Sequence, residues 1–164
     1  MQQHNKPKSF GQIIGLVAAL IVLVCFFVPW LEVGLSFLRV TLSGWQLASG
    51  SGPAEMKVPG VMSLWLVPLS MVVTAIIIVG SLMNAHRTVA SVRSTALLML
   101  MLGGVSALAL LYNYFDLNHQ FNRDVMGMLA QNLVSYAPGW AVSLLGSLAV
   151  LAGGAIDLGS HGRA

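Results

Sequence analysis

The chain has 164 residues, of which 57% are hydrophobic and 8% are charged, and its mean hydropathy is +0.83. Soluble globular domains carry about 25% charged residues, so the composition excludes an ordinary water-soluble domain and predicts that apolar side chains face lipid. The formal net charge of +3 comes from a few scattered residues, which excludes a basic nucleic-acid-binding surface. The single cysteine, Cys25, excludes an internal disulfide framework.

The first apolar run follows a polar N-terminus that carries Lys6 and Lys8, and no charge occurs from Ile13 to Leu31. A basic start before an apolar core is also typical of a signal peptide. This run is longer than such a core, however, and Pro29-Trp30-Leu31 offers no small-residue cleavage site. We therefore expect an uncleaved membrane span over about residues 11–31.

The first outer loop, residues 32–60, begins with strict alternation of apolar and other residues. The alternation runs from Leu31 to Phe37 and occurs again from Leu38 to Leu42. A period of two predicts strands, so we expect a small β-hairpin outside the membrane, closed by a turn that bears Trp45. The stretch Ser49–Pro53, rich in serine and glycine, predicts a flexible connector.

Three further apolar runs predict spans over about residues 61–83, 95–115 and 139–158. Pro138 precedes the last span and suits the first turn of a helix. The expected fold class is an all-α membrane protein, in which residues 1–164 form one integral domain built on a four-transmembrane-helix bundle.

The second outer loop, residues 116–138, repeats apolar residues at helical spacing: Val125, Leu129, Leu133 and Tyr136. This pattern predicts an amphipathic helix in the membrane interface. The alternative is an ordinary capping helix that shields the first outer loop.

Basic residues and aromatic rings predict the orientation. One side would carry Lys6, Lys8, Arg87, Arg93 and Arg163, against Arg39, Lys57 and Arg123 on the other. The positive-inside rule then places both termini in the cytoplasm, here of a bacterial inner membrane. The tryptophans Trp30, Trp45, Trp65 and Trp140 all fall on the outer side, which predicts a packed outer layer anchored by these rings or, alternatively, a simple aromatic belt.

Asp157 is the only ionisable candidate within the predicted spans. Ionisable residues inside a membrane usually mark ion paths or ligand sites. At the cytoplasmic end of the last span, Asp157 is expected to reach interfacial water or to pair with Arg87 or Arg93. The alternative is a salt bridge to a partner subunit.

The sequence shows no pattern typical of haem ligation, metal binding or nucleophilic catalysis. All four histidines lie outside the spans, so we expect no haem. No spacing typical of metal ligands and no nucleophile with a positioned base occurs. We therefore predict no catalytic, cofactor-binding or metal-binding residues, and no enzymatic activity.

Small residues mark two predicted helix faces. Gly11 and Gly15 form a GxxxG pattern in the first span, and Gly146 and Gly153 lie on one face of the last span. Small residues let membrane helices approach closely. These faces serve packing within the chain or docking to a neighbouring subunit.

The pair of motifs Pro29-Trp30 and Ser43-Gly44-Trp45 resembles the first outer loop of small bacterial four-span membrane proteins of uncharacterised function. The plan is also similar to the claudin topology, although the paired cysteines of claudins are missing from this loop. The resemblance implies a four-span topology and no particular activity.

The sequence thus predicts a non-catalytic accessory or scaffold subunit of a larger bacterial membrane complex, with respiratory and photosynthetic complexes among the candidates. Its expected partners are other integral membrane subunits and membrane lipids, and not nucleic acid. The alternative function is a small homo-oligomeric transporter or channel, whose polar route would use Ser70, Thr74, Ser106, Asn113, Ser143 and Ser147.

Overall fold

The computed structural model of the chain describes residues 10–35, 38–51, 60–84, 88–123 and 134–161. Helices dominate these residues, and a small sheet accompanies them. The elements in chain order are α1 (Phe10–Cys25), β1 (Pro29–Leu35), β2 (Leu38–Ser43), α2 (Gly44–Ser49), the 3₁₀ helix η1 (Met62–Trp65), α3 (Leu66–Met83), α4 (Val89–Arg123), β3 (Val134–Tyr136) and α6 (Pro138–His161).

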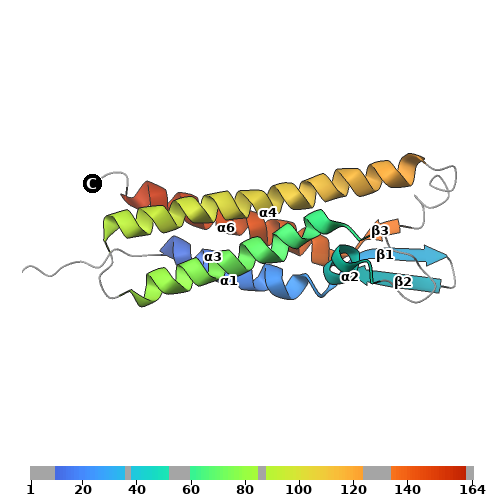
Figure 1. The fold of residues 1–164 in the computed structure, drawn as a ribbon, viewed down its shortest axis with the longest axis horizontal. Coiled ribbons are helices and arrows are strands. Elements are labelled where there is room, and N and C mark those ends of the chain that lie inside the picture. The colour runs from blue at the N-terminus through green and yellow to red at the C-terminus, as the bar shows by residue number, and fades with distance from the viewer. Residues whose placement is uncertain (1–9, 36–37, 52–59, 85–87, 124–133, 162–164) are drawn as a thin grey trace, which may run out of the picture.

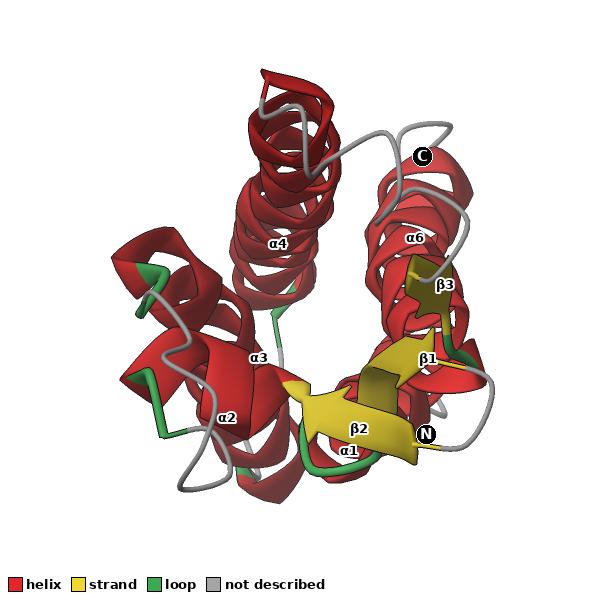
Figure 2. Cartoon of the chain, turned by 90° about the vertical axis from the view of Figure 1, so that its right-hand side faces the viewer, coloured by secondary structure: helices red, strands yellow, loops and turns green. Residues whose placement is uncertain are grey.

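Four helices run side by side along the length of the molecule, and the strands and α2 lie at one end, which we call the sheet end (Figure 1). Helix α6 packs against α1 and α4, and α3 packs against the same two helices on the other side. Viewed from the sheet end, the four helices therefore surround a common core, and the sheet covers part of the bundle (Figure 2).

Three helical segments are long and apolar enough to cross a membrane: Met62–Met83, Val89–Leu117 and Pro138–Ser160. They correspond to the predicted second, third and fourth spans. Helix α1 has 16 residues, which at about 1.5 Å per residue extend about 24 Å. The hydrocarbon core of a bilayer is about 30 Å thick, so α1 is shorter than a standard span.

The predicted boundary of the first span is wrong. Helix α1 ends at Cys25, and β1 already begins at Pro29. The apolar run does not stop there because Trp30 and Leu31 of β1 are also buried. A buried strand and a buried helix are equally apolar, so hydropathy alone does not show where one ends and the other begins.

The predicted hairpin is confirmed by an antiparallel pairing of β1 with β2, in which Glu32 lies opposite Thr41 and Leu35 opposite Leu38. Trp45 comes after β2 and does not connect the two strands, so the predicted closing turn at Trp45 is wrong. A third strand, β3, pairs with the other edge of β1, which gives the order β2-β1-β3.

Trp45 instead belongs to α2, whose first turn is fixed by a capping box. The backbone nitrogen of Gln46 donates to the Ser43 hydroxyl, and the Gln46 side-chain oxygen accepts from the Ser43 nitrogen. These bonds satisfy backbone groups that a helix start leaves open. Gly50 ends α2 with a φ of 70°, a left-handed conformation that glycine adopts without steric cost.

The predicted interfacial helix is wrong where the structure describes it. Residues 116–123 continue α4, which has 35 residues and a length of about 52 Å, and Tyr136 belongs to strand β3. Val125, Leu129 and Leu133 lie outside the described residues. The C-terminal turns of α4 run past the ends of the other helices, alongside the sheet (Figure 1).

Candidate interaction site at the sheet end

The structure places most of the predicted site residues at the two ends of the bundle. Trp30, Trp45, Trp65 and Trp140 belong to β1, α2, η1 and α6, which all meet at the sheet end. Gly11, Gly153 and Asp157 meet at the opposite end, where α1 begins. Gly15 packs against Met99 and Gly146 against Val22, between these two ends.

One half of the sheet end is a chain of aromatic rings from the turn after α1, from β1, from α2 and from η1. Phe27 stacks on Trp45 with ring centroids 5.8 Å apart, and Trp45 meets Trp65 edge-on at 5.0 Å. Phe26 then connects Trp65, at 6.1 Å, to Trp30, at 5.6 Å. Such offset and edge-on contacts are the favourable geometries of aromatic pairs.

The other half joins α4, β3 and α6. Tyr114 is its centre, with ring centroids 4.7 Å from Tyr136, 5.0 Å from Trp140 and 5.6 Å from Phe115. Tyr136 also contacts Trp140 at 5.6 Å. We call these nine rings the aromatic layer: Phe26, Phe27, Trp30, Trp45, Trp65, Tyr114, Phe115, Tyr136 and Trp140. Each of the four tryptophans has at least one ring contact in this layer.

Trp30 fixes the layer to the bundle. Its side chain is 1% exposed, its Nε1 atom donates to the Cys25 carbonyl at 2.8 Å, and its own carbonyl accepts from the Ala137 nitrogen at 2.9 Å. A Cβ atom on Gly44 or Gly139 would lie 2.8 Å from the indole. The ring therefore requires glycine on both sides, and α2 and α6 pack directly against it.

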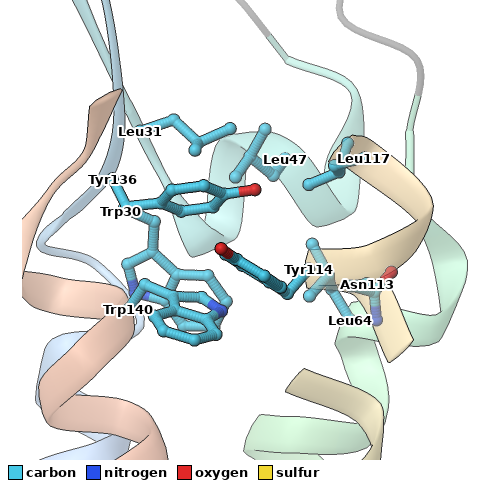
Figure 3. Close-up of a pocket in the computed structure, with 9 residues that line it drawn as sticks. All are labelled: Trp30, Leu31, Leu47, Leu64, Asn113, Tyr114, Leu117, Tyr136 and Trp140. Carbon is cyan, nitrogen blue, oxygen red and sulfur yellow. The ribbon is translucent and has the colours of Figure 1, made fainter. Parts of the chain in front are cut away.

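A small pocket opens between the two halves of the layer, bordered by the sheet on one side and α4 on the other (Figure 3). Its cavity volume is ≈ 10 Å³, about the space that one water molecule requires. Apolar and aromatic side chains form most of its wall, and the residues that line it are Trp30, Leu31, Leu47, Leu64, Asn113, Tyr114, Leu117, Tyr136 and Trp140.

The polar groups of this pocket differ in how they are bonded. Asn113 is fixed, because its Nδ2 atom donates to the Ala109 carbonyl at 2.6 Å and its Oδ1 atom accepts from the Ser63 hydroxyl at 2.8 Å. The hydroxyls of Tyr114 and Tyr136 point into the space between the sheet and α4 (Figure 3). Burial and the neighbouring Tyr114 both raise the pKa of Tyr136, so this phenol stays neutral at physiological pH.

At the opposite end, Asp157 joins the last helix to the first. Its Oδ1 atom accepts a hydrogen bond from the Gly11 nitrogen at 3.0 Å, which is one of the backbone donors that the first turn of α1 leaves open. The carboxyl is 1% exposed, so it does not reach interfacial water as predicted. The start of a helix also favours a negative group through the helix dipole.

The predicted small-residue faces pack against each other within the chain. A Cβ atom on Gly153 would lie 2.5 Å from the Gly11 carbonyl, and one on Gly11 would overlap the Gly153 carbonyl. On the neighbouring face of α6, a Cβ atom on Gly154 would lie 2.7 Å from the Ala96 carbonyl of α4. Close backbone approach to both α1 and α4 therefore depends on these glycines.

The six polar residues considered for a solute route are all buried and hydrogen-bonded inside the bundle. Four of them donate to the backbone of the preceding turn of their own helix: Ser70, Thr74, Ser143 and Ser147. The Ser106 and Ser147 hydroxyls bond each other at 2.9 Å between α4 and α6, and Asn113 is bonded as described above. These groups thus stabilise helices and helix contacts.

Among the described residues, no group of three or more His, Cys, Asp or Glu side chains lies close enough to hold a metal ion. The role of Phe26 and Phe27 in the aromatic layer was not predicted, because the sequence indicated only that they belong to a membrane span. Helix α2 was not predicted either, although Ser43 followed three residues later by Gln46 is the signature of a capping box. No local signal marks the pairing of β3 with β1.

Comparison with known proteins finds no family model that matches the chain and no curated protein that matches it.

Proposed function

We propose that this chain is a non-catalytic accessory or scaffold subunit of a larger bacterial membrane complex, a respiratory or photosynthetic complex being the leading case. The observation that carries the proposal is how the polar side chains of the bundle are used. The six polar side chains that could line a route for a solute are all buried and hydrogen-bonded within the bundle. This favours a packing role over the alternative, a homo-oligomeric transporter or channel.

The sheet end is the part of the molecule that we propose for contact with partner subunits. Trp45 is 41% exposed although it stacks on Phe27 and contacts Trp65. An aromatic ring that is held in place by its neighbours and remains open on one face loses little side-chain entropy on binding, which is typical of interface anchors. Lipids would cover the apolar faces of the helices.

The proposed topology has four spans, with both termini in the cytoplasm. Helix α1 lies alongside the other three helices, and its exposed residues are all apolar: Phe10, Ile13, Val17, Leu20, Ile21 and Val24. A face of this kind is suited to lipid. The apolar turn from Phe26 to Val28 extends the hydrophobic length of α1 toward the sheet.

The topology is tested by labelling single cysteines in a Cys25→Ala background. A cysteine at Phe10, before α1, and one at Gly159, near the end of α6, are expected to react from the same side of the membrane. A cysteine at Ser51, after α2, should react from the other side. Labelling of Phe10 and Ser51 positions from one side would contradict a spanning α1.

The docking role is tested by Trp45→Ala, compared with Leu108→Ala. Leu108 is also exposed and apolar but lies in the middle of α4. We expect the Trp45 variant to assemble poorly on native gels of the complex and the Leu108 variant to assemble normally. Full assembly of the Trp45 variant would contradict the role of this ring. Solute flux through liposomes that contain the purified chain would instead favour the transporter.

A further inference from the structure

Tyr114 and Tyr136 form the closest pair of aromatic rings that the structure records. Their ring centroids are 4.7 Å apart, and the ring planes are inclined by 41°. The two residues come from different elements, α4 and β3, so the contact depends on the fold. Both hydroxyls project into the same small pocket (Figure 3), and no hydrogen bond within the described residues engages either one.

The pair is also within reach of dissolved reagents. Tyr136 is 37% exposed and Tyr114 is partly exposed. Both lie at the sheet end, where the Tyr114 ring contacts Tyr136 of β3. Their closest aromatic neighbour is Trp140, at 5.0 Å from Tyr114 and 5.6 Å from Tyr136. Two phenols in ring contact and open to solvent are the arrangement that radical coupling requires.

We propose that Tyr114 and Tyr136 are an oxidative modification site, at which a one-electron oxidant links the two rings as dityrosine. A peroxide-driven haem peroxidase represents the class of oxidant required. Each phenol loses one electron to the oxidant and one proton to water, which gives two tyrosyl radicals. A carbon–carbon bond then forms between the ring positions next to the hydroxyls, and a hydrogen shift restores both aromatic rings.

The net change is the loss of two hydrogen atoms from the chain. Its structural effect is a covalent bond between β3 and α4, which closes the connection between these elements into a ring and fixes the third strand of the sheet to the bundle. A cross-link of this kind restricts the unfolded chain, as a disulfide does. The inference is independent of the proposed function, because it rests on the ring contact and on the exposure of the two phenols.

The chain contains three tyrosines, and the third provides a matched control. Tyr112 lies in the same helix as Tyr114 and is 64% exposed, but it contacts no aromatic ring of the described residues. Replacing any tyrosine with phenylalanine keeps the ring and removes only the hydroxyl, so Tyr112→Phe, Tyr114→Phe and Tyr136→Phe should all fold.

The experiment oxidises the detergent-solubilised chain and the three variants with a photoexcited ruthenium complex and persulfate. Dityrosine fluorescence is then measured in the monomer band of a denaturing gel. Trypsin cuts after Arg123, between the two tyrosines, so the linkage is identified as a pair of joined peptides by mass spectrometry. We expect the signal in the native chain and in Tyr112→Phe, and only background in Tyr114→Phe and Tyr136→Phe.

Oxidation of the chain in denaturant tests whether the cross-link depends on the folded structure. The link between Tyr114 and Tyr136 should be formed preferentially in the folded chain and lose that preference on unfolding. Equal yields in both states would overturn the proposal. It would also be overturned if the folded chain gave no cross-linked monomer, or if either the Tyr114 or the Tyr136 variant kept the full signal.

Discussion

The Oδ1 atom of Asp157 lies 3.0 Å from the backbone nitrogen of Gly11, so the last helix caps the start of the first. A helix normally satisfies its first backbone donors with a residue next to it in sequence. Here the acceptor comes from the other end of the chain, and it also fixes how α1 and α6 are aligned along their length. The two helices are therefore held by a polar contact at one end and by the aromatic layer at the other.

The first prediction concerns this cap. Asp157→Ala should lower the free energy of unfolding by about 2 kcal/mol, because a buried backbone donor loses its acceptor. Asp157→Asn keeps an oxygen acceptor and should cost less. The measurement is thermal or denaturant unfolding in detergent. The control is Ser160→Ala, which removes the bond of this hydroxyl to the Asp157 carbonyl but leaves the Asp157 carboxylate in place. An alanine variant as stable as the native chain would show that the cap is dispensable.

The second prediction concerns the contact between α1 and α6. Gly153→Ala places a methyl group 2.5 Å from the Gly11 carbonyl, and overpacking of this kind costs about 1–3 kcal/mol. Gly80→Ala is the matched control, since a Cβ atom there meets nothing within 4 Å and alanine favours the helix by up to about 1 kcal/mol. Equal unfolding midpoints for the two variants would argue against a tight glycine contact.

The third prediction concerns the position of Trp45 on α2. Ser43→Ala removes the hydroxyl that caps Gln46 and should destabilise α2 by about 1 kcal/mol, which is measured as faster hydrogen exchange of the amides in Gly44–Ser49. Ser49→Ala removes the bonds of its hydroxyl to the Trp45 carbonyl and to the Ser51 hydroxyl at the exposed end of the same helix, leaves the capping box intact, and serves as control. If both variants exchange like the native chain, the capping box does not hold this helix.

The fourth prediction is a dependence on alkaline pH. Burial and Tyr114 raise the pKa of Tyr136 above the ordinary tyrosine value of about 10, so the folded state favours the neutral phenol. Around and above this pH the folded chain binds more protons than the unfolded chain, and stability should be complete below about pH 10 and fall as the pH rises further. Unfolding midpoints measured across this range should fall less steeply in Tyr136→Phe than in the native chain; identical slopes would contradict the assignment.

The parts of the fold that depend on local pattern were predictable from sequence. The apolar runs locate α3, α4 and α6 because a bilayer demands continuous hydrophobicity, and the alternation after Leu31 locates the β1–β2 pair. The end of α1 was not predictable from hydropathy, because Trp30 is as apolar in a strand as in a helix. The extension of α4 to Arg123 is polar, so it carries no membrane signal.

The candidate site was predictable only in outline. Aromatic residues concentrated at one end indicated a packed layer there, but the ring pairs form between elements that are distant in sequence. Tyr136 has helical spacing with Leu129 and Leu133, yet its pairing opposite Leu31 places it in a strand. Likewise, Asp157 was expected to reach interfacial water or to pair with Arg87 or Arg93, of which Arg87 lies outside the described residues. Its acceptor role toward Gly11 arises only when α1 and α6 meet.

The most direct test of the accessory-subunit proposal is a gentle-detergent pull-down of the C-terminally tagged chain from its native membrane. Partners are identified by mass spectrometry, and absorbance spectra report any cofactors that they carry. We predict a stoichiometric set of larger membrane subunits. Recovery of this chain alone, as a defined oligomer, would contradict the proposal and favour the transporter.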